Sequence, residues 1–136
     1  MIIDASVAVK LIVPEELSGR AQDLVLSAQM SAPDLLLVEV ANAIWSKAKR
    51  GEIVNRISWM KVFPAIVPNL TPSADLMEAA LDLAIELGHP VYDCFYLALA
   101  IRSDEVLITA DKRFLNALRG SLHASRVIAL ADWNPT

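Results

Sequence analysis

Four acidic side chains lie in apolar surroundings, where an unpaired carboxylate is unfavourable. Asp4 ends an apolar run at the beginning of the sequence, and Asp111 lies just beyond a second apolar run. Asp93 opens a stretch made of Val, Cys, Phe, Tyr, Leu and Ala, and Glu39 has Leu and Val on both sides. Because a buried carboxylate is costly unless it is paired or binds a metal, these residues are candidates for one functional site.

A carboxylate cluster of this kind is suited to a hard divalent cation. Carboxylates without basic partners repel one another unless a cation binds, and ligand sets made only of oxygen favour Mg²⁺ or Mn²⁺. Zinc is not expected, because His89 and His123 match no zinc spacing and Cys94 is the single cysteine. A carboxylate-held cation activates water and stabilises charge on phosphate oxygens, so the pattern predicts hydrolysis of a phosphodiester bond.

Motifs of the main alternative chemistries are absent from the sequence. It contains no Gly-x-Ser-x-Gly elbow, no Walker-type Gly-Lys-Ser/Thr loop and no Gly-x-Gly-x-x-Gly fingerprint. A HAD-like phosphatase needs a second acid two residues after its nucleophilic aspartate, but Ser6 occupies that position after Asp4. A flap-type DNA nuclease needs additional clamp elements, for which 136 residues leave no room.

Each of the four acids also has a purely structural interpretation. Asp4 and Asp111 could each cap a following helix, and Asp93 could complement the positive end of its helix. Glu39 could lie partly exposed on a helix edge. Taken singly, the structural role is the simpler one for Glu39 and Asp111, and the two interpretations balance for the others. Taken together the acids favour a shared site, because all four must fit into one small apolar core.

The elements that must position these acids follow from apolar periodicity and from helix-stop residues. Short apolar runs predict strands, and stretches of helical spacing separate them. The expected strands are 1–4, 30–32, 66–70, 105–109 and 126–130, and the expected helices are 5–13, 15–29, 35–50, 55–63, 72–87, 91–102 and 112–118. Such an alternation predicts an α/β fold with a parallel sheet covered on both faces. The carboxyl ends of its strands would bring Asp4 and Asp111 to one edge.

Three local features of the predicted helices can be tested directly. The helix 72–87 should bury Leu and Ala side chains at helical spacing and end at Gly88. Asp34 is the expected N-cap of the helix 35–50, on which Trp45 is expected to enter the core. The helix 55–63 should be interrupted at Pro64.

Length and composition predict one domain that spans residues 1–136. The chain is 55% hydrophobic, with 21% charged residues, and its mean hydropathy is +0.44. A protein this small and this apolar is expected to cover part of its surface, through a homodimer or a partner chain.

A cytoplasmic location is expected from the same composition. No stretch has the roughly 18 uncharged apolar residues of a membrane span, and no basic region precedes an apolar segment as in a signal peptide. The single cysteine is typical of a reducing compartment.

Charge is distributed unevenly along the chain. The formal net charge of −4 argues against nucleic-acid binding through bulk charge. A basic stretch between Lys47 and Lys61 could hold phosphates, although an ordinary solvated helix end is the simpler interpretation.

Four motifs, in order along the chain, resemble the PIN-domain family. Ile2-Ile3-Asp4-Ala5-Ser6 resembles its hydrophobic-Asp-x-Ser/Thr start, and Val38-Glu39-Val40-Ala41-Asn42 is similar to its Glu-x-x-Asn helix segment. Tyr92-Asp93-Cys94 with the following Tyr96–Ala100 resembles its third acidic motif, and Leu107–Phe114 resembles the closing Thr-x-Asp-x-x-Phe motif. Order, spacing and coverage are similar to those of VapC-like toxins, the ribonucleases of type II toxin–antitoxin systems.

The resemblance implies a three-layer α/β/α sandwich and a metal-dependent endoribonuclease. Mg²⁺, or Mn²⁺ in its place, would be held by Asp4, Glu39, Asp93 and Asp111, with Ser6, Asn42 and Thr109 as supporting polar groups. The implied partners are an RNA substrate, a VapB-like antitoxin and a second copy of the chain. Metal-activated water would leave a 5′-phosphate and a 3′-hydroxyl. The alternative is a catalytically silent scaffold that only binds protein or RNA, which the intact acids disfavour.

We further hypothesise that the segment 55–63 contributes a dimer or antitoxin surface. It combines Trp59 with other large apolar side chains and has few expected helix-packing neighbours.

Overall fold

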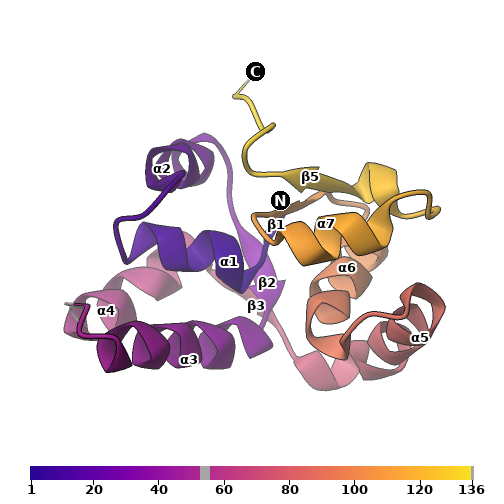
Figure 1. The fold of residues 1–136 in the computed structure, drawn as a ribbon, viewed down its shortest axis with the longest axis horizontal. Coiled ribbons are helices and arrows are strands. Elements are labelled where there is room, and N and C mark those ends of the chain that lie inside the picture. Colours follow the sequence, from indigo (N-terminus) through magenta and orange to yellow (C-terminus); the bar gives the residue numbers. More distant parts are fainter. Residues whose placement is uncertain (53–55, 136) are drawn as a thin grey trace.

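Five short parallel strands form the centre of the fold (Figure 1). The computed structural model describes the backbone of residues 1–52 and 56–135, and the side chains of these residues other than 56–60. The strands are β1 (Ile2–Ile3), β2 (Ser31–Pro33), β3 (Asn69–Thr71), β4 (Leu107–Thr109) and β5 (Val127–Ala129). Their order is β3-β2-β1-β4-β5. The direction in which strands are added therefore reverses at β1, and such a switch point leaves a crevice at the carboxyl ends of the strands.

Helices lie on both sides of this sheet and complete a three-layer α/β/α sandwich (Figure 1). The helices are α1 (Ala5–Ala8), α2 (Ser18–Ser27), α3 (Leu35–Lys49), α4 (Arg56–Ile66), α5 (Met77–Leu87), α6 (Val91–Ser103) and α7 (Lys112–Leu118). Short 3₁₀ turns follow α1 (η1, Val9–Leu11) and precede α5 and β5 (η2, Ser73–Leu76; η3, Ala124–Arg126). None of the described helices is long and apolar enough to cross a lipid bilayer.

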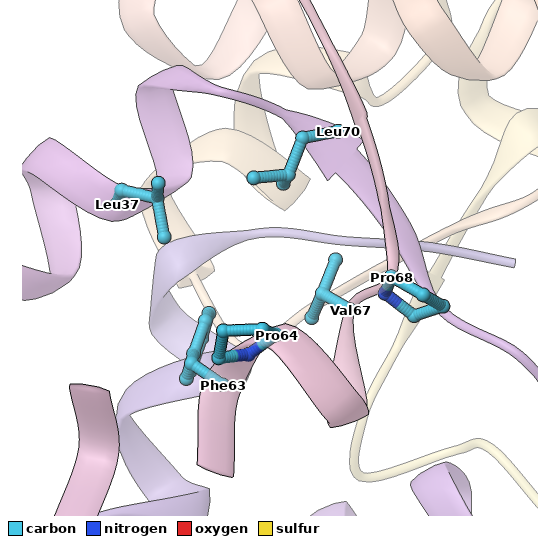
Figure 2. A pocket seen from close by; sticks show the side chains of 6 residues that line it. All are labelled: Leu37, Phe63, Pro64, Val67, Pro68 and Leu70. Carbon is cyan, nitrogen blue, oxygen red and sulfur yellow. The ribbon is translucent and has the colours of Figure 1, made fainter. Parts of the chain in front are cut away.

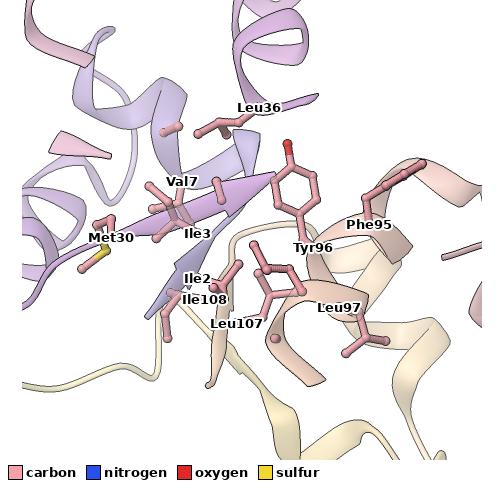
Figure 3. Packing of buried hydrophobic residues seen from close by; sticks show 14 of the residues in the cluster. Ile2, Ile3, Val7, Met30, Leu36, Phe95, Tyr96, Leu97, Leu107 and Ile108 are labelled. Carbon is pink, nitrogen blue, oxygen red and sulfur yellow. The ribbon is translucent and has the colours of Figure 1, made fainter. Parts of the chain in front are cut away.

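Helix α6 is the central helix of the molecule. All its side chains from Cys94 to Ala100 are buried, and it contacts β1, β2 and β4 on one side and α5 on another. Figure 3 shows Tyr96 among the strand residues Ile2 and Leu107, with its hydroxyl directed out of the apolar cluster toward α3. The apolar composition of this helix all round predicted its central position, and that prediction is confirmed.

The predicted parallel α/β architecture is confirmed, whereas several element boundaries differ. Helix α2 begins only at Ser18, because Leu17 adopts a left-handed backbone with φ of 67°. The predicted helix 5–13 is divided into α1 and a 3₁₀ turn. Asp34 precedes α3 as expected, but its carboxylate accepts hydrogen bonds from the backbone and hydroxyl of Ser73 instead of capping the helix.

Two predictions about the α3–α4 region are wrong. Trp45 is 59% exposed instead of entering the core, and its ring lies under the Lys49 ammonium, 5.2 Å from the ring centroid. Helix α4 continues through Pro64 to Ile66, so the interruption does not occur. Only two helical residues follow Pro64, and Val67 still donates to the Phe63 carbonyl at 2.9 Å, so the proline removes little from the end of the helix. Residue 55 and the Trp59 side chain, on which the surface hypothesis depends, lie outside the described residues.

Gly88 ends α5 in the left-handed region, with φ of 62°, and leads directly into the turn before α6. A Cβ at this position would meet no described atom within 4 Å, so Gly88→Ala should lose only the backbone preference, about 1 kcal/mol of unfolding free energy. Chemical denaturation measures the loss.

Gly19 provides the matched control, because a Cβ there also meets no described atom within 4 Å and its backbone is not left-handed. Gly19→Ala in α2 should be neutral or stabilising by up to about 1 kcal/mol. Equal losses in the two variants would contradict the assignment of strain to Gly88.

Candidate metal centre

Asp4 lies at the junction of the two central strands and is only 3% exposed. The register pairs Ile2 with Leu107 and Ile3 with Ile108, so Asp4 and Thr109 are the next residues along β1 and β4. The Oδ1 atom of Asp4 accepts from the Ser6 hydroxyl at 2.5 Å and from the Val7 amide at 3.1 Å. Its Oδ2 atom accepts from the Thr109 hydroxyl. Both carboxylate oxygens are therefore held in place.

The same two hydroxyls tie the end of β4 to Asp4. The Ala110 amide donates to Ser6 Oγ at 2.9 Å, and the Asp111 amide donates to Thr109 Oγ1 at 3.0 Å. Ser6 and Thr109 thus hold the Asp4 carboxylate and the backbone that follows β4 together.

Asp111 has a structural role at the start of α7. Its Oδ1 atom accepts from the amides of Arg113 at 2.8 Å and Phe114 at 3.2 Å, which makes it the N-cap of that helix. This capping role is the one considered for Asp111 from the sequence. It engages one carboxylate oxygen, and no hydrogen bond to the other is found among the described residues.

Glu39 is half-buried on α3 and bonded to the central helix. The hydroxyl of Tyr96 donates to its Oε1 atom at 2.6 Å. Burial raises the pKa of the Glu39 carboxyl; the Tyr96 hydrogen bond lowers it, and the charges of Asp93 and Asp111 raise it further. Burial, followed by the neighbouring Glu39 charge, also raises the pKa of Tyr96 well above its usual value, so the phenol stays protonated and donates.

Asp93 lies in the first turn of α6 and contacts a histidine. Its Oδ2 atom is 2.6 Å from His89 Nε2, and the two side chains are 21% and 11% exposed. The imidazole lies against the Phe114 ring, at 5.1 Å between centroids. Burial raises the pKa of the Asp93 carboxyl, the bond to His89 lowers it, and Asp111 raises it. Burial and Asp93 also raise the pKa of the neighbouring Cys94 thiol to about 11, which keeps this thiol protonated near neutral pH.

Tyr96 and His89 are site residues that sequence reasoning did not assign. Tyr96 lies three residues after Asp93 on the same helix, a spacing that places both side chains on one face. His89 lies four residues before Asp93, and the intervening Pro90 obscured that relation because it ends the helical pattern.

The charges of the predicted acids affect one another's pKa values. Asp93 raises the pKa of Asp4, and Asp111 raises the pKa of both Glu39 and Asp93. No strong cationic partner reaches these carboxylates in the described part of the chain, apart from the titratable His89. The side chain of Asn42, by contrast, is exposed and forms no hydrogen bond with another described residue.

The donor chemistry of this group fits a hard divalent cation, but the acids are not arranged as a closed ligand shell. Among the described residues, no three acidic, histidine or cysteine side chains are arranged so that they could hold a metal ion. The fit rests instead on donors that are all oxygen atoms and on the repulsion between the acids. In Glu39, Asp93 and Asp111, hydrogen bonds from described residues engage only one of the two carboxylate oxygens. A cation would relieve the repulsion that the four acids exert on one another.

Comparison with known proteins gives a family match and two curated relatives. The PIN domain model matches residues 1–119. A protein of Pyrobaculum aerophilum named ribonuclease VapC3 is 35% identical over 120 residues, covering 83% of this chain and 90% of the relative. A second protein of that organism, exonuclease VapC9, is 28% identical over 98 residues, covering 69% of this chain and 71% of the relative. Strand β5 lies beyond residue 119 yet pairs with β4, so it belongs to the same sheet.

Two solved structures share the fold. The crystal structure of PAE2754 from Pyrobaculum aerophilum has a TM-score of 0.61 at 20% identity and covers 96% of this chain and 90% of its own. A toxin–antitoxin complex from Klebsiella pneumoniae gives a TM-score of 0.63 at 16% identity, and the match covers 95% of this chain and 96% of the chain in the complex. At these identities the likeness supports the architecture alone.

The raised pKa of Asp4 predicts how the metal-free protein responds to pH. Burial raises this pKa from 3.8 to about 7. The preference of the folded protein for the protonated carboxyl therefore stabilises the fold fully below pH 3.8, and this contribution is lost as the pH rises through 7. Urea denaturation in EDTA should give a lower unfolding free energy at pH 8 than at pH 5, by roughly 1–3 kcal/mol.

Asp4→Asn should remove most of that pH dependence and make the metal-free protein more stable at pH 8. Asp82→Asn, which replaces an exposed acid on α5, is the matched control and should retain the wild-type dependence. An unchanged pH profile in Asp4→Asn would show that another group is responsible.

Proposed function

The chain belongs to the PIN domain family, and from this premise we propose that it is a metal-dependent endoribonuclease, the VapC-like toxin of a toxin–antitoxin pair. The observation that supports the proposal is that Asp4 and Asp111 lie just beyond β1 and β4, beside the switch point of the sheet, and that the charges of Asp93 and Asp111 act on the other predicted acids. The relative named ribonuclease VapC3, at 35% identity, supports the same activity.

The residues proposed to hold the cation are Asp4, Glu39, Asp93 and Asp111. Mg²⁺ is the proposed ion and Mn²⁺ its substitute, because all the available donors are carboxylate oxygens. When bound, such an ion activates water and neutralises charge on the phosphate of an RNA phosphodiester.

The surrounding residues determine how each carboxylate is presented. Ser6 and Thr109 hold both oxygens of Asp4. Tyr96 fixes Glu39 through one oxygen, and His89 does the same for Asp93. Such hydrogen bonds orient metal-binding side chains. We propose that the products are a 5′-phosphate and a 3′-hydroxyl, since no protein nucleophile is needed.

Two partners and a location complete the proposal. A VapB-like antitoxin is proposed on the basis of the VapC-named relatives. A second copy of the chain is proposed because Met77, Leu81 and Ile85, spaced four residues apart on α5, are 57%, 52% and 73% exposed. A cytoplasmic location is supported by the single, buried free cysteine.

Purified protein should cut cellular RNA at discrete internal positions with Mg²⁺ or Mn²⁺, and not with EDTA. Asp93→Asn should lower the rate by at least about a hundredfold while the melting temperature is kept or raised, since the variant loses a ligand and a repelling charge. Asp82→Asn should cleave like the wild type.

The substrate design separates the possible outcomes. Because one relative is named an exonuclease, a circularised RNA should be included: cutting of the circle requires an internal break, whereas trimming of linear RNA alone would contradict endonucleolytic action. Products with 2′,3′-cyclic phosphate ends would contradict attack by water. Absence of cleavage with either ion would favour the silent scaffold.

The proposed dimer gives a separate prediction. Leu81→Arg places a charge in the exposed apolar row of α5 and should convert a dimer into a monomer in sedimentation analysis. Leu26→Arg, on α2, changes a side chain that is 85% exposed and should leave the mass unchanged. A monomeric wild-type protein, or dissociation by both variants alike, would contradict the α5 surface.

A further inference from the structure

A hollow of about 430 Å³ lies beside the carboxylate cluster. It is lined by Leu35, Val38, Glu39, Asn42 and Tyr92. Glu39 therefore belongs both to the cluster and to the wall of the hollow. The volume is within the range of small-molecule sites.

Helices α3 and α6 both contribute residues to the lining of this hollow. Val38, Glu39 and Asn42 lie within about one turn of α3, and Tyr92 lies in the first turn of α6. Figure 1 labels both helices. Tyr92 and Asp93 are neighbours on α6, and neighbouring residues on a helix point about 100° apart. The side chain of Asp93 is directed toward the other acids, and that of Tyr92 therefore lines the adjoining hollow.

Two side chains of the hollow are unusually open to solvent for their type. Tyr92 is 59% exposed and Val38 is 67% exposed. The exposed aromatic ring lies next in sequence to Asp93, and the exposed Asn42 amide carries both a donor and an acceptor. An exposed apolar patch with polar groups at its rim is typical of interaction and ligand-binding surfaces.

The other hollows described in the structure lack a connection to the acids. One is lined by Leu37, Phe63, Pro64, Val67, Pro68 and Leu70, side chains without a titratable group (Figure 2). Another lies between residues 25–29 and the end of α4. Of these hollows, the one beside Glu39 alone adjoins the place where a phosphate would bind.

We propose that this hollow binds the base of the nucleotide next to the scissile phosphate, with Tyr92 stacking on the base. The inference rests on the proposed ribonuclease function. A phosphate held at the carboxylates carries its sugar and base with it, and the base must occupy a neighbouring space. Aromatic stacking with an amide near the base edge is the usual way in which proteins bind single-stranded RNA.

The chemistry of the lining favours a base over a peptide side chain. Val38 and Leu35 offer apolar surface and Tyr92 offers a ring face, which suit the flat apolar face of a base. Asn42 can bond to either donors or acceptors on a base edge. The charged group of the hollow, Glu39, already accepts a hydrogen bond from Tyr96 and is assigned to the cation.

The test compares steady-state cleavage of one RNA by the wild type, Tyr92→Ala and Tyr92→Phe. Tyr92→Ala should raise KM about tenfold and change kcat by less than about threefold, because stacking acts on binding. Tyr92→Phe keeps the ring and should restore the wild-type KM. Leu26→Ala, which changes a side chain 85% exposed on α2, is the control for an exposed apolar residue.

Val38→Phe provides a second approach from the α3 side, because it fills the hollow from a residue already exposed. It should also raise KM, and it should alter the preferred base beside the cut. Wild-type KM and cutting positions in both Tyr92→Ala and Val38→Phe would overturn the subsite. Equal loss in Tyr92→Phe and Tyr92→Ala would overturn stacking, because the hydroxyl would then be responsible.

Binding measurements keep the subsite distinguishable from the ribonuclease function. Fluorescein-labelled oligoribonucleotides of A, C, G or U are titrated with Asp93→Asn protein in Mg²⁺, with and without Tyr92→Ala. A roughly tenfold weaker affinity with Tyr92→Ala supports the subsite even if the wild type cuts no RNA, a result that would overturn the ribonuclease function alone. Unchanged RNA affinity, with weakened binding of a co-encoded antitoxin, would overturn the subsite and assign the hollow to a protein partner.

Discussion

The buried carboxylate of Asp4 is the constraint on which the rest of the structure depends. It ends β1, accepts from Ser6 and Val7 on the chain that follows, and accepts from Thr109 at the end of β4. Because Ser6 and Thr109 in turn accept hydrogen bonds from the backbone amides of residues 110 and 111, the two central strands end in one hydrogen-bonded unit. Any displacement of Asp4 would therefore move the start of α7 as well.

Around this unit, three acids lie in surroundings that disfavour their charged forms. Burial raises the pKa of Asp4, Glu39 and Asp93, and their neighbours add repulsion. The compensating groups are neutral or weakly basic: two hydroxyls, a phenol and an imidazole. A fully cationic partner, such as arginine, would satisfy the acids permanently and would compete with a metal ion. These weak donors hold the side chains in place without neutralising their charge.

The sequence was sufficient for the architecture and for the part of the site that local patterns define. Asp4 and Asp111 could be placed at one edge because each follows an apolar run, and α6 could be placed centrally because it lacks a polar face. Contacts between distant residues could not be inferred in this way: Tyr96 meets Glu39 across 57 residues, and the contact depends on how α3 and α6 pack. Trp45 was misplaced for a related reason, since periodicity does not reveal which face of a helix a neighbour leaves uncovered. Pro64 was misjudged because the rule for proline in a helix weakens near the helix end.

The double role of Asp111 has a consequence for reading related sequences. Its Oδ1 atom caps α7, so this acid contributes to folding independently of any cation. Selection for a stable fold alone would retain it in a descendant that no longer cuts RNA. Glu39 and Asp93 accept no hydrogen bond from a backbone amide of the described residues, so the fold depends less on them. In related proteins that have lost catalytic activity, these two positions should change first, and they are the ones to inspect when activity is inferred from sequence.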